Sequence, residues 1–194
     1  MITIRRLEPA LRDAFFALHC DANGAGWCRC IAWWVPTWDG WDGRTAEGNR
    51  SLREELFDRG EYDGYLLFVT EDGVERPVAW CQTGPRDRLI KLARQFALAP
   101  EPDTWAISCF FVAPSHRRQG LVAQLLDHVL RDLARRGAKQ VEAFPKLADD
   151  LDAEDLWTGP RALLSSRGFA PRPDRAKGDV WVRSLGDLVE SGSS

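Results

Sequence analysis

The chain has 194 residues, of which 44% are hydrophobic and 28% are charged, and its formal net charge is -3. This length and composition are those of one soluble globular domain. A small negative charge excludes general nucleic-acid binding, which requires clustered lysine and arginine side chains. The sequence contains no apolar run of about 18 residues that could cross a membrane. We therefore expect a cytoplasmic protein that binds neither nucleic acid nor membrane.

Hydrophobic periodicity predicts strands and helices along most of the chain. The predicted strands are 2–7, 65–69, 78–81, 105–112, 141–144 and 180–183. The predicted helices are 9–18, 45–59, 86–97, 119–136 and 156–167. Their order predicts an α/β fold, with one domain over 1–194 and a mixed sheet of about six to seven strands flanked by helices. The end of the chain, 186–194, is predicted to be a flexible tail.

A tryptophan-rich and acidic segment, 21–63, interrupts this pattern. Residues 26 to 41 hold five tryptophans and two cysteines in sixteen positions. Between Pro36 and Asp63, eight acids oppose four arginines, which gives a local charge of 4 − 8 = −4. Indole rings stack on sugars and attract cations, and carboxylates pair with ammonium groups. The segment favours a pocket wall for a polar, cationic small molecule, and packing of the insertion onto the sheet is the alternative.

The cysteines predict no metal site. Cys28 and Cys30 are separated by one residue, whereas zinc ligands are usually separated by about two to four residues and matched by a second pair. Cys81 and Cys109 fall on different predicted strands. The odd total of five cysteines favours free thiols over disulfide bonds.

The strongest chemical signal is a strand, a basic turn and a helix, which read C-F-F-V-A-P-S-H-R-R-Q-G-L-V-A-Q-L-L from Cys109 to Leu126. The first turn of a helix has free backbone N–H groups and about half a positive charge, which together bind phosphate. Gly120 allows close approach of the backbone, and Arg117 and Arg118 add charged donors. The turn indicates an anion site, and a solvated helix start is the alternative.

In this region the chain resembles the GNAT acetyltransferase superfamily, whose signature after the fourth strand reads R/Q-x-x-G-x-G/A. The matching residues read R-R-Q-G-L-V, with Val122 in place of the usual Gly or Ala. The segments V-A-W-C-Q-T-G-P-R, V-E-A-F-P and S-S-R-G-F follow the order of the family between Tyr65 and Arg183. The resemblance implies a fold in which the fourth and fifth strands splay apart.

The resemblance also implies transfer of an acetyl group from acetyl-CoA to an amine, without a metal, by direct attack of the amine on the thioester. The free edge of the fourth strand would pair with the pantetheine arm like an added strand, and the basic turn would hold the pyrophosphate. The implied cofactor-binding residues are Phe111, Val112, Arg117, Arg118, Gln119, Gly120, Leu121, Val122 and Ala123.

A base would help this reaction, because an alkylamine pKa of about 10.4 makes deprotonation at neutral pH cost roughly 4–5 kcal/mol. Glu142, on the strand beside the cleft, is the first candidate, and Asp103, ahead of the fourth strand, is the second. A solvated strand carboxylate is the alternative role of Glu142. The tyrosine that usually serves the family as general acid is replaced by Leu164. The thiolate would therefore leave as the anion, or take its proton from water or another group such as Ser165.

The family places acceptor specificity in its first helices and their loop, which correspond to 20–63 here. The predicted substrate-binding residues are Trp33, Trp34, Trp38, Asp39, Glu61 and Asp63. An amino sugar or an aminoglycoside antibiotic, modified in antibiotic resistance, fits both the rings and the acids. A protein or peptide amine is the alternative acceptor, and a CoA-binding sensor without activity is the alternative function. The chain is expected to be a monomer or a homodimer.

Overall fold

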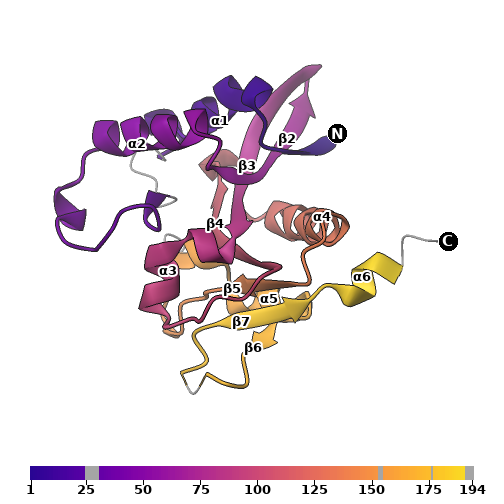
Figure 1. The fold of residues 1–194 in the computed structure, drawn as a ribbon. Helices are drawn as coiled ribbons and strands as arrows, with labels where there is room; N and C mark the ends of the chain where they lie inside the picture. The colour runs from indigo at the N-terminus through magenta and orange to yellow at the C-terminus, as the bar shows by residue number, and fades with distance from the viewer. Residues whose placement is uncertain (25–30, 153–154, 176, 191–194) are drawn as a thin grey trace.

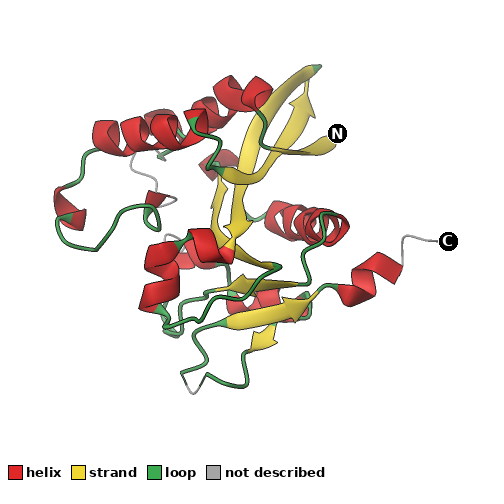
Figure 2. Cartoon of the chain, in the orientation of Figure 1, coloured by secondary structure: helices red, strands yellow, loops and turns green. Residues whose placement is uncertain are grey.

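The computed structural model describes residues 1–24, 31–152, 155–175 and 177–190. They form one mixed sheet flanked by helices (Figures 1 and 2), which confirms the predicted α/β fold class. The strands are β1 (Ile2–Arg6), β2 (Asp63–Glu71), β3 (Val74–Pro85), β4 (Thr104–Val112), β5 (Gln140–Ala143), β6 (Ala170–Pro171) and β7 (Trp181–Ser184). The helices are α1 (Arg12–Leu18), α2 (Ala46–Asp58), α3 (Ile90–Gln95), α4 (Leu121–Arg135), α5 (Arg161–Ser166) and α6 (Gly186–Glu190).

The described strands lie in the order β1-β2-β3-β4-β5-β7-β6, and only the β4–β5 pair among them is parallel. This pair runs from Thr104 opposite Gln140 to Ile107 opposite Ala143. β4 continues to Val112, so its last residues have no partner on the β5 side within the described part of the chain. The predicted splay between the fourth and fifth strands is therefore present.

A bulge in β4 lies where the two strands separate. In the pairing with β3, Gln82 is opposite Cys109 and Thr83 is opposite Ile107, so Ser108 is the additional residue. A bulge bends the strand that carries it and interrupts its hydrogen-bond ladder. Because pairing with β5 stops one residue before Ser108, we attribute the splay to this bend.

α4 covers one face of the sheet because its apolar residues recur at helical spacing. Its buried residues are Leu121, Leu125, Leu126, Val129, Leu130, Leu133 and Ala134. They share one apolar core with side chains of β2, β3, β4 and β5. In Figure 1, α4 lies to the right of the sheet, close to α6.

The helices α1, α2 and α3 lie on the opposite face of the sheet, at the left of Figure 1. Alternation along β3 separates the two faces, because Ala79 and Cys81 belong to the core beneath α4, whereas Trp80 packs against Phe15 of α1 with ring centroids 5.0 Å apart. Trp33 is buried on this same side with residues of α3. Trp33, Trp34 and Trp41 of the tryptophan-rich segment thus pack on the face away from α4.

The helix predicted over 156–167 is divided in two. A 3₁₀ helix spans Asp155–Thr158 and α5 begins only at Arg161. Gly159 has a φ of 101°, which a helix does not accommodate, and Pro160 has no N–H to donate. The break lets the 3₁₀ helix lie against β4.

Within the predicted flexible tail, residues 186–190 form α6. The side chain of Arg183 donates to Asp187 at 2.7 Å, so the end of β7 is tied to this helix. The remainder of the predicted tail, 191–194, lies outside the described residues. The sequence also gave no signal for β6, because two paired residues are too few to show a period.

Candidate active site

The loop before α4 has the backbone geometry of an anion site. Arg118 and Gly120 have positive φ values of 60° and 73°, so the chain turns sharply before the helix. The N–H of Ala123 bonds to the carbonyl of Gly120 at 3.1 Å. In contrast, the five N–H groups of 118–122 make no hydrogen bond within the described part of the chain. Consecutive free donors at the positive end of a helix suit a phosphate group.

The side chains of this loop leave its backbone accessible. Arg117 and Arg118 are exposed, and a Cβ built on Gly120 would meet nothing within 4 Å. Val122, which departs from the pattern of the family, is partly buried against the core beneath α4. Arg117 also donates from Nε to the carbonyl of Val112 at 3.2 Å. The loop is thereby joined to the last residue of the free β4 edge.

The other end of this edge is fixed by the tryptophan-rich segment. Trp33 donates from Nε1 to the carbonyl of Ser108 at 3.4 Å. Its ring lies 6.1 Å from that of Trp157, in the 3₁₀ helix beside β4. The half-buried Phe111 and Val112 lie farther along the edge. A free strand edge of 108–112 therefore connects the bulge to the anion loop.

Glu142 does not have the surroundings predicted for a general base. Its side chain is 0% exposed, and it lies on the face opposite Val141 and Ala143, as expected from strand alternation. Arg86, itself 1% exposed, donates to both carboxylate oxygens at 3.3 and 3.4 Å, and Arg172 forms a second ion pair with Glu142. Because both oxygens are already bonded in the interior, an amine has no open path to them. Glu142 fits a buried ion-pair cluster better than the predicted role.

Asp103 is also badly placed for catalysis. It precedes β4 at the end of the strand opposite the splay, about 16 Å along the chain from Ser108 at about 3.3 Å per residue. Its side chain is 47% exposed and pairs with Lys139 at 2.8 Å. Position in the sequence before a strand does not say which end of the sheet borders the cleft, and this geometry does not favour the predicted role.

The position of the family's usual acid holds no donor. Leu164 is fully buried in the core beneath α4, and the neighbouring Ser165 is exposed. Trp157, in the 3₁₀ helix before α5, packs beside Trp33. The position where the family has a tyrosine hydroxyl is therefore filled by an apolar side chain that packs in the core.

The ring of Trp38 makes a cation–π contact with Lys91 of the same chain. The Nζ atom of Lys91 lies 3.2 Å from the centroid of the Trp38 ring and 5.5 Å from that of Trp41. The same Nζ donates to the carbonyl of Ala32 at 2.8 Å. Burial, and after it the charge of Arg44, lower the pKa of Lys91 to about 8. Lys91 was missed from the sequence, where a lysine in a short amphipathic helix gives no signal.

The predicted acids do not gather around the tryptophans. Asp63 lies on the α4 side of the sheet, where Arg136 donates to it at 2.8 Å and Arg6 at 3.2 Å. Glu61 pairs with Arg59 at 3.8 Å, and its side chain is 41% exposed. Asp39 is exposed and accepts a hydrogen bond from the hydroxyl of the nearby Thr37 at 3.2 Å. The structure therefore separates Asp63 from the tryptophan side and engages the other two acids at the surface.

Trp34 belongs to a stack of rings on the tryptophan side. Its centroid lies 6.1 Å from that of Tyr62, which lies 6.2 Å from that of Trp80. Trp80 precedes Gln82 on β3, a buried glutamine that the sequence analysis did not single out. A polar residue within an apolar strand is the signal that could have found both Gln82 and Ser108.

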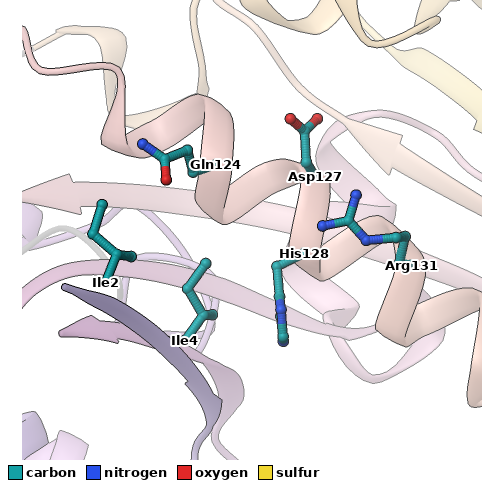
Figure 3. Close-up of a pocket in the computed structure, with 6 residues that line it drawn as sticks. All are labelled: Ile2, Ile4, Gln124, Asp127, His128 and Arg131. Atoms are coloured by element: carbon teal, nitrogen blue, oxygen red, sulfur yellow. The ribbon is translucent and has the colours of Figure 1, made fainter.

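A hollow on the opposite side of the molecule lies between β1 and α4 (Figure 3). It is lined by Ile2, Ile4, Gln124, Asp127, His128 and Arg131. Burial lowers the pKa of His128, and Asp127 is paired with Arg167 at 3.0 Å. The hollow is on the α4 face, so it is separate from the tryptophan side.

Within the described ranges, no cluster of three or more metal-ligating side chains is present. Cys28 and Cys30 lie outside those ranges. The described helices also include none with the length and apolar character needed to span a membrane.

Comparison with known proteins identifies the family. The model of the acetyltransferase (GNAT) family matches residues 27–158, so the chain belongs to this family of N-acetyltransferases. A GNAT-family acetyltransferase from Desulfovibrio desulfuricans has a similar structure, with a TM-score of 0.58, 17% identity, and coverage of 96% of this chain and 100% of that chain.

Two further structures share the fold. A GNAT-family N-acetyltransferase from Escherichia coli, solved in complex with CoA, gives a TM-score of 0.54 at 18% identity and covers 96% of this chain and 82% of that chain. An acetyltransferase from Salmonella typhimurium, solved with acetyl-CoA, gives 0.51 at 16% identity and covers 96% of this chain and 95% of that chain.

Proposed function

We propose that the chain transfers the acetyl group of acetyl-CoA to the primary amine of a small molecule. The observation that carries the proposal is the continuity of the free β4 edge with the anion loop through the bond from Arg117 to Val112. The free N–H groups of 118–122 would hold the pyrophosphate, together with the exposed Arg117 and Arg118. The edge of 109–112 would pair with the pantetheine arm, which directs the thioester toward Ser108.

The chemistry is direct attack of a neutral amine on the thioester carbon. The new C–N bond replaces the C–S bond, the CoA thiolate leaves, and the proton lost by the nitrogen passes to solvent or to the thiolate. Because Glu142 is already paired, we assign the first deprotonation to water. At neutral pH this step costs roughly 4–5 kcal/mol for an alkylamine but only about 1 kcal/mol for an amine with a pKa near 8. Weakly basic amines are therefore the favoured acceptors.

We place the acceptor on the tryptophan side of the sheet, next to Trp33 and Ser108. A small molecule fits this site because the described part of the insertion packs over the end of β4. The acids are dispersed, and Lys91 makes a cation–π contact with the Trp38 ring. Both observations disfavour a polycationic aminoglycoside as the acceptor. An amino sugar remains within the proposed class because its ring also presents hydroxyl groups.

Calorimetric titration with acetyl-CoA, followed by a thiol-release assay over amines, tests the proposal. We expect micromolar binding and release of CoA with at least one amine. No binding of acetyl-CoA would remove the assignment of the loop and edge.

A CoA-binding protein without transferase activity is a second candidate, favoured by the apolar packing at Leu164. Binding of acetyl-CoA combined with a silent amine panel would support this candidate. Loss of a general acid typically costs about 10²–10⁴-fold in rate, so slow turnover would still favour the enzyme.

A further inference from the structure

Buried polar atoms without a hydrogen-bond partner surround the point where β4 leaves β5. Gln82 is 1% exposed, and neither its Oε1 nor its Nε2 has a partner within the described part of the chain. The Oγ of Ser108, a residue also 1% exposed, is equally unpaired. The other members of this neutral polar set are Trp34 Nε1, Trp157 Nε1 and Thr158 Oγ1. Such atoms are uncommon in folded proteins, and several in one place indicate a ligand or water.

Contacts link this neutral polar set across the end of the strands. Gln82 lies opposite the residue that follows Ser108. The carbonyl of Ser108 accepts the bond from Trp33, whose ring lies 6.1 Å from that of Trp157. Thr158 follows directly in the 3₁₀ helix against β4. These four members therefore come from β3, from the β4 bulge and from the element that faces β4.

Stacked rings connect Gln82 to Trp34 on the other side. Trp80 and Gln82 are two residues apart on β3 and share a face. The ring of Trp80 fills the space beside Gly64, which is opposite Gln82 in β2, because a Cβ there would lie 2.3 Å from the ring. Tyr62 stacks on Trp80 and Trp34 stacks on Tyr62, with interplanar angles of 20° and 21°. The Trp80 ring thus lies beside Gln82 on this face, and the stack continues from it through Tyr62 to Trp34.

We propose that the neutral polar set binds the acceptor through a hydroxyl or carboxamide group next to its amine, with Gln82 as the main specificity-determining residue. This inference rests on the proposed function. A hydroxyl and a carboxamide both donate and accept, which matches the two ends of the Gln82 amide. A charged substituent would find no opposite charge among these five side chains, and burial of an unpaired charge is strongly unfavourable.

The same acceptor class fits the chemistry of the site. An electron-withdrawing hydroxyl or amide beside an amine lowers the basicity of that amine, and a larger neutral fraction can attack without a protein base. Recognition and reactivity are therefore served by one substituent.

The first test needs no ligand. The variant Gln82→Met keeps the size of the side chain and removes an unpaired amide, so we expect the midpoint of thermal unfolding to rise by about 2–4 °C. The matched control is Gln140→Met, because Gln140 donates to Glu101 at 2.5 Å and to Thr104 at 2.9 Å, and its midpoint should fall. A fall for Gln82→Met as large as that of the control would show a structural role and overturn the proposal.

The second test measures acceptor selectivity by thiol release. The wild-type protein should favour glucosamine and glycinamide over propylamine and putrescine in kcat/KM, and Gln82→Met should reduce that preference about 10- to 100-fold. Gln140→Met should keep it. Equal use of propylamine by the wild-type protein, or an unchanged preference in Gln82→Met, would overturn the proposal.

Control measurements separate this proposal from the proposed function. Calorimetry should give the same acetyl-CoA affinity for Gln82→Met and the wild-type protein. Absence of acetyl-CoA binding to the wild-type protein would count against the function itself. Binding of acetyl-CoA with no acetylation of glucosamine or glycinamide would overturn only the acceptor class assigned here.

Discussion

Replacement of Glu142 by Gln distinguishes a structural ion pair from a catalytic base. The change removes the negative charge between two guanidinium groups, of which Arg86 is 1% exposed. Loss of one partner from a buried pair typically costs about 3–5 kcal/mol. Arg86 keeps Asp87 at 2.9 Å and the carbonyl of Ala99 at 2.5 Å, so we place the cost at about 2–4 kcal/mol. That loss corresponds to a fall of about 5–15 °C in the unfolding midpoint.

The assay combines thermal unfolding with kcat measured well below the midpoint of the variant. We expect the midpoint to fall and kcat to change by less than about fivefold, with the shape of the pH–rate profile kept. Loss of a general base would instead lower kcat by about 10²–10⁴-fold. Such a loss, without destabilisation, would refute the structural role. Asp103→Asn is the control, because its pair with Lys139 is exposed to solvent and contributes little to stability.

Three further substitutions test other parts of the structure. Gly120→Ala should cost about 1–2 kcal/mol of stability through its positive φ and weaken acetyl-CoA binding in calorimetry. Gly73→Ala, with a similar φ and equally open surroundings, should cost the same stability and leave acetyl-CoA binding unchanged. Equal acetyl-CoA affinities of the Gly120→Ala and Gly73→Ala variants would contradict the loop assignment. Because the pKa of Lys91 is lowered to about 8 in the fold, the unfolded chain binds more protons than the folded protein between about pH 8 and 10. The free energy of unfolding of the wild-type protein, measured in urea, should therefore rise over this pH range by about 1–3 kcal/mol relative to that of Lys91→Met. Parallel pH dependences of the two free energies would contradict this. Gly64→Ala places a Cβ 2.3 Å from the Trp80 ring and should destabilise by about 2–3 kcal/mol in urea unfolding, so an unchanged midpoint would show that the ring can move.

The sequence predicted the fold where periodicity and a backbone-encoded motif agree. α4 is found close to its predicted bounds because its apolar stripe continues over four turns and because the turn before it contains Gly120. The unpaired donors of that turn belong to the backbone, so their presence follows from chain geometry rather than from particular side-chain partners. The same reasoning failed over 156–167, where Gly159 and Pro160 outweigh the apolar spacing.

The candidate catalytic residues could not be predicted in the same way. Whether a carboxylate is a free base depends on which cations reach it through the fold. Arg86 and Arg172 are 56 and 30 residues from Glu142 along the chain, and no local pattern shows that they converge. Asp63 illustrates a related point, since strand parity places it with Arg136 on the α4 side, away from the tryptophans. Long-range pairing of charges therefore limits what composition can say about a site.

The tryptophan-rich segment shows how this limit changes the expected acceptor. Rings and acids together favour a cation, but the ammonium of Lys91 already occupies the face of Trp38 and bonds to Ala32. That contact holds the insertion against α3, while the bond from Trp33 to Ser108 holds it against β4. The aromatic residues thus act first as anchors that position the walls of the site. The unpaired polar atoms, above all those of Gln82, are then the better guide to the acceptor. Because these atoms belong to neutral side chains, they favour a neutral hydrogen-bonding group on the acceptor.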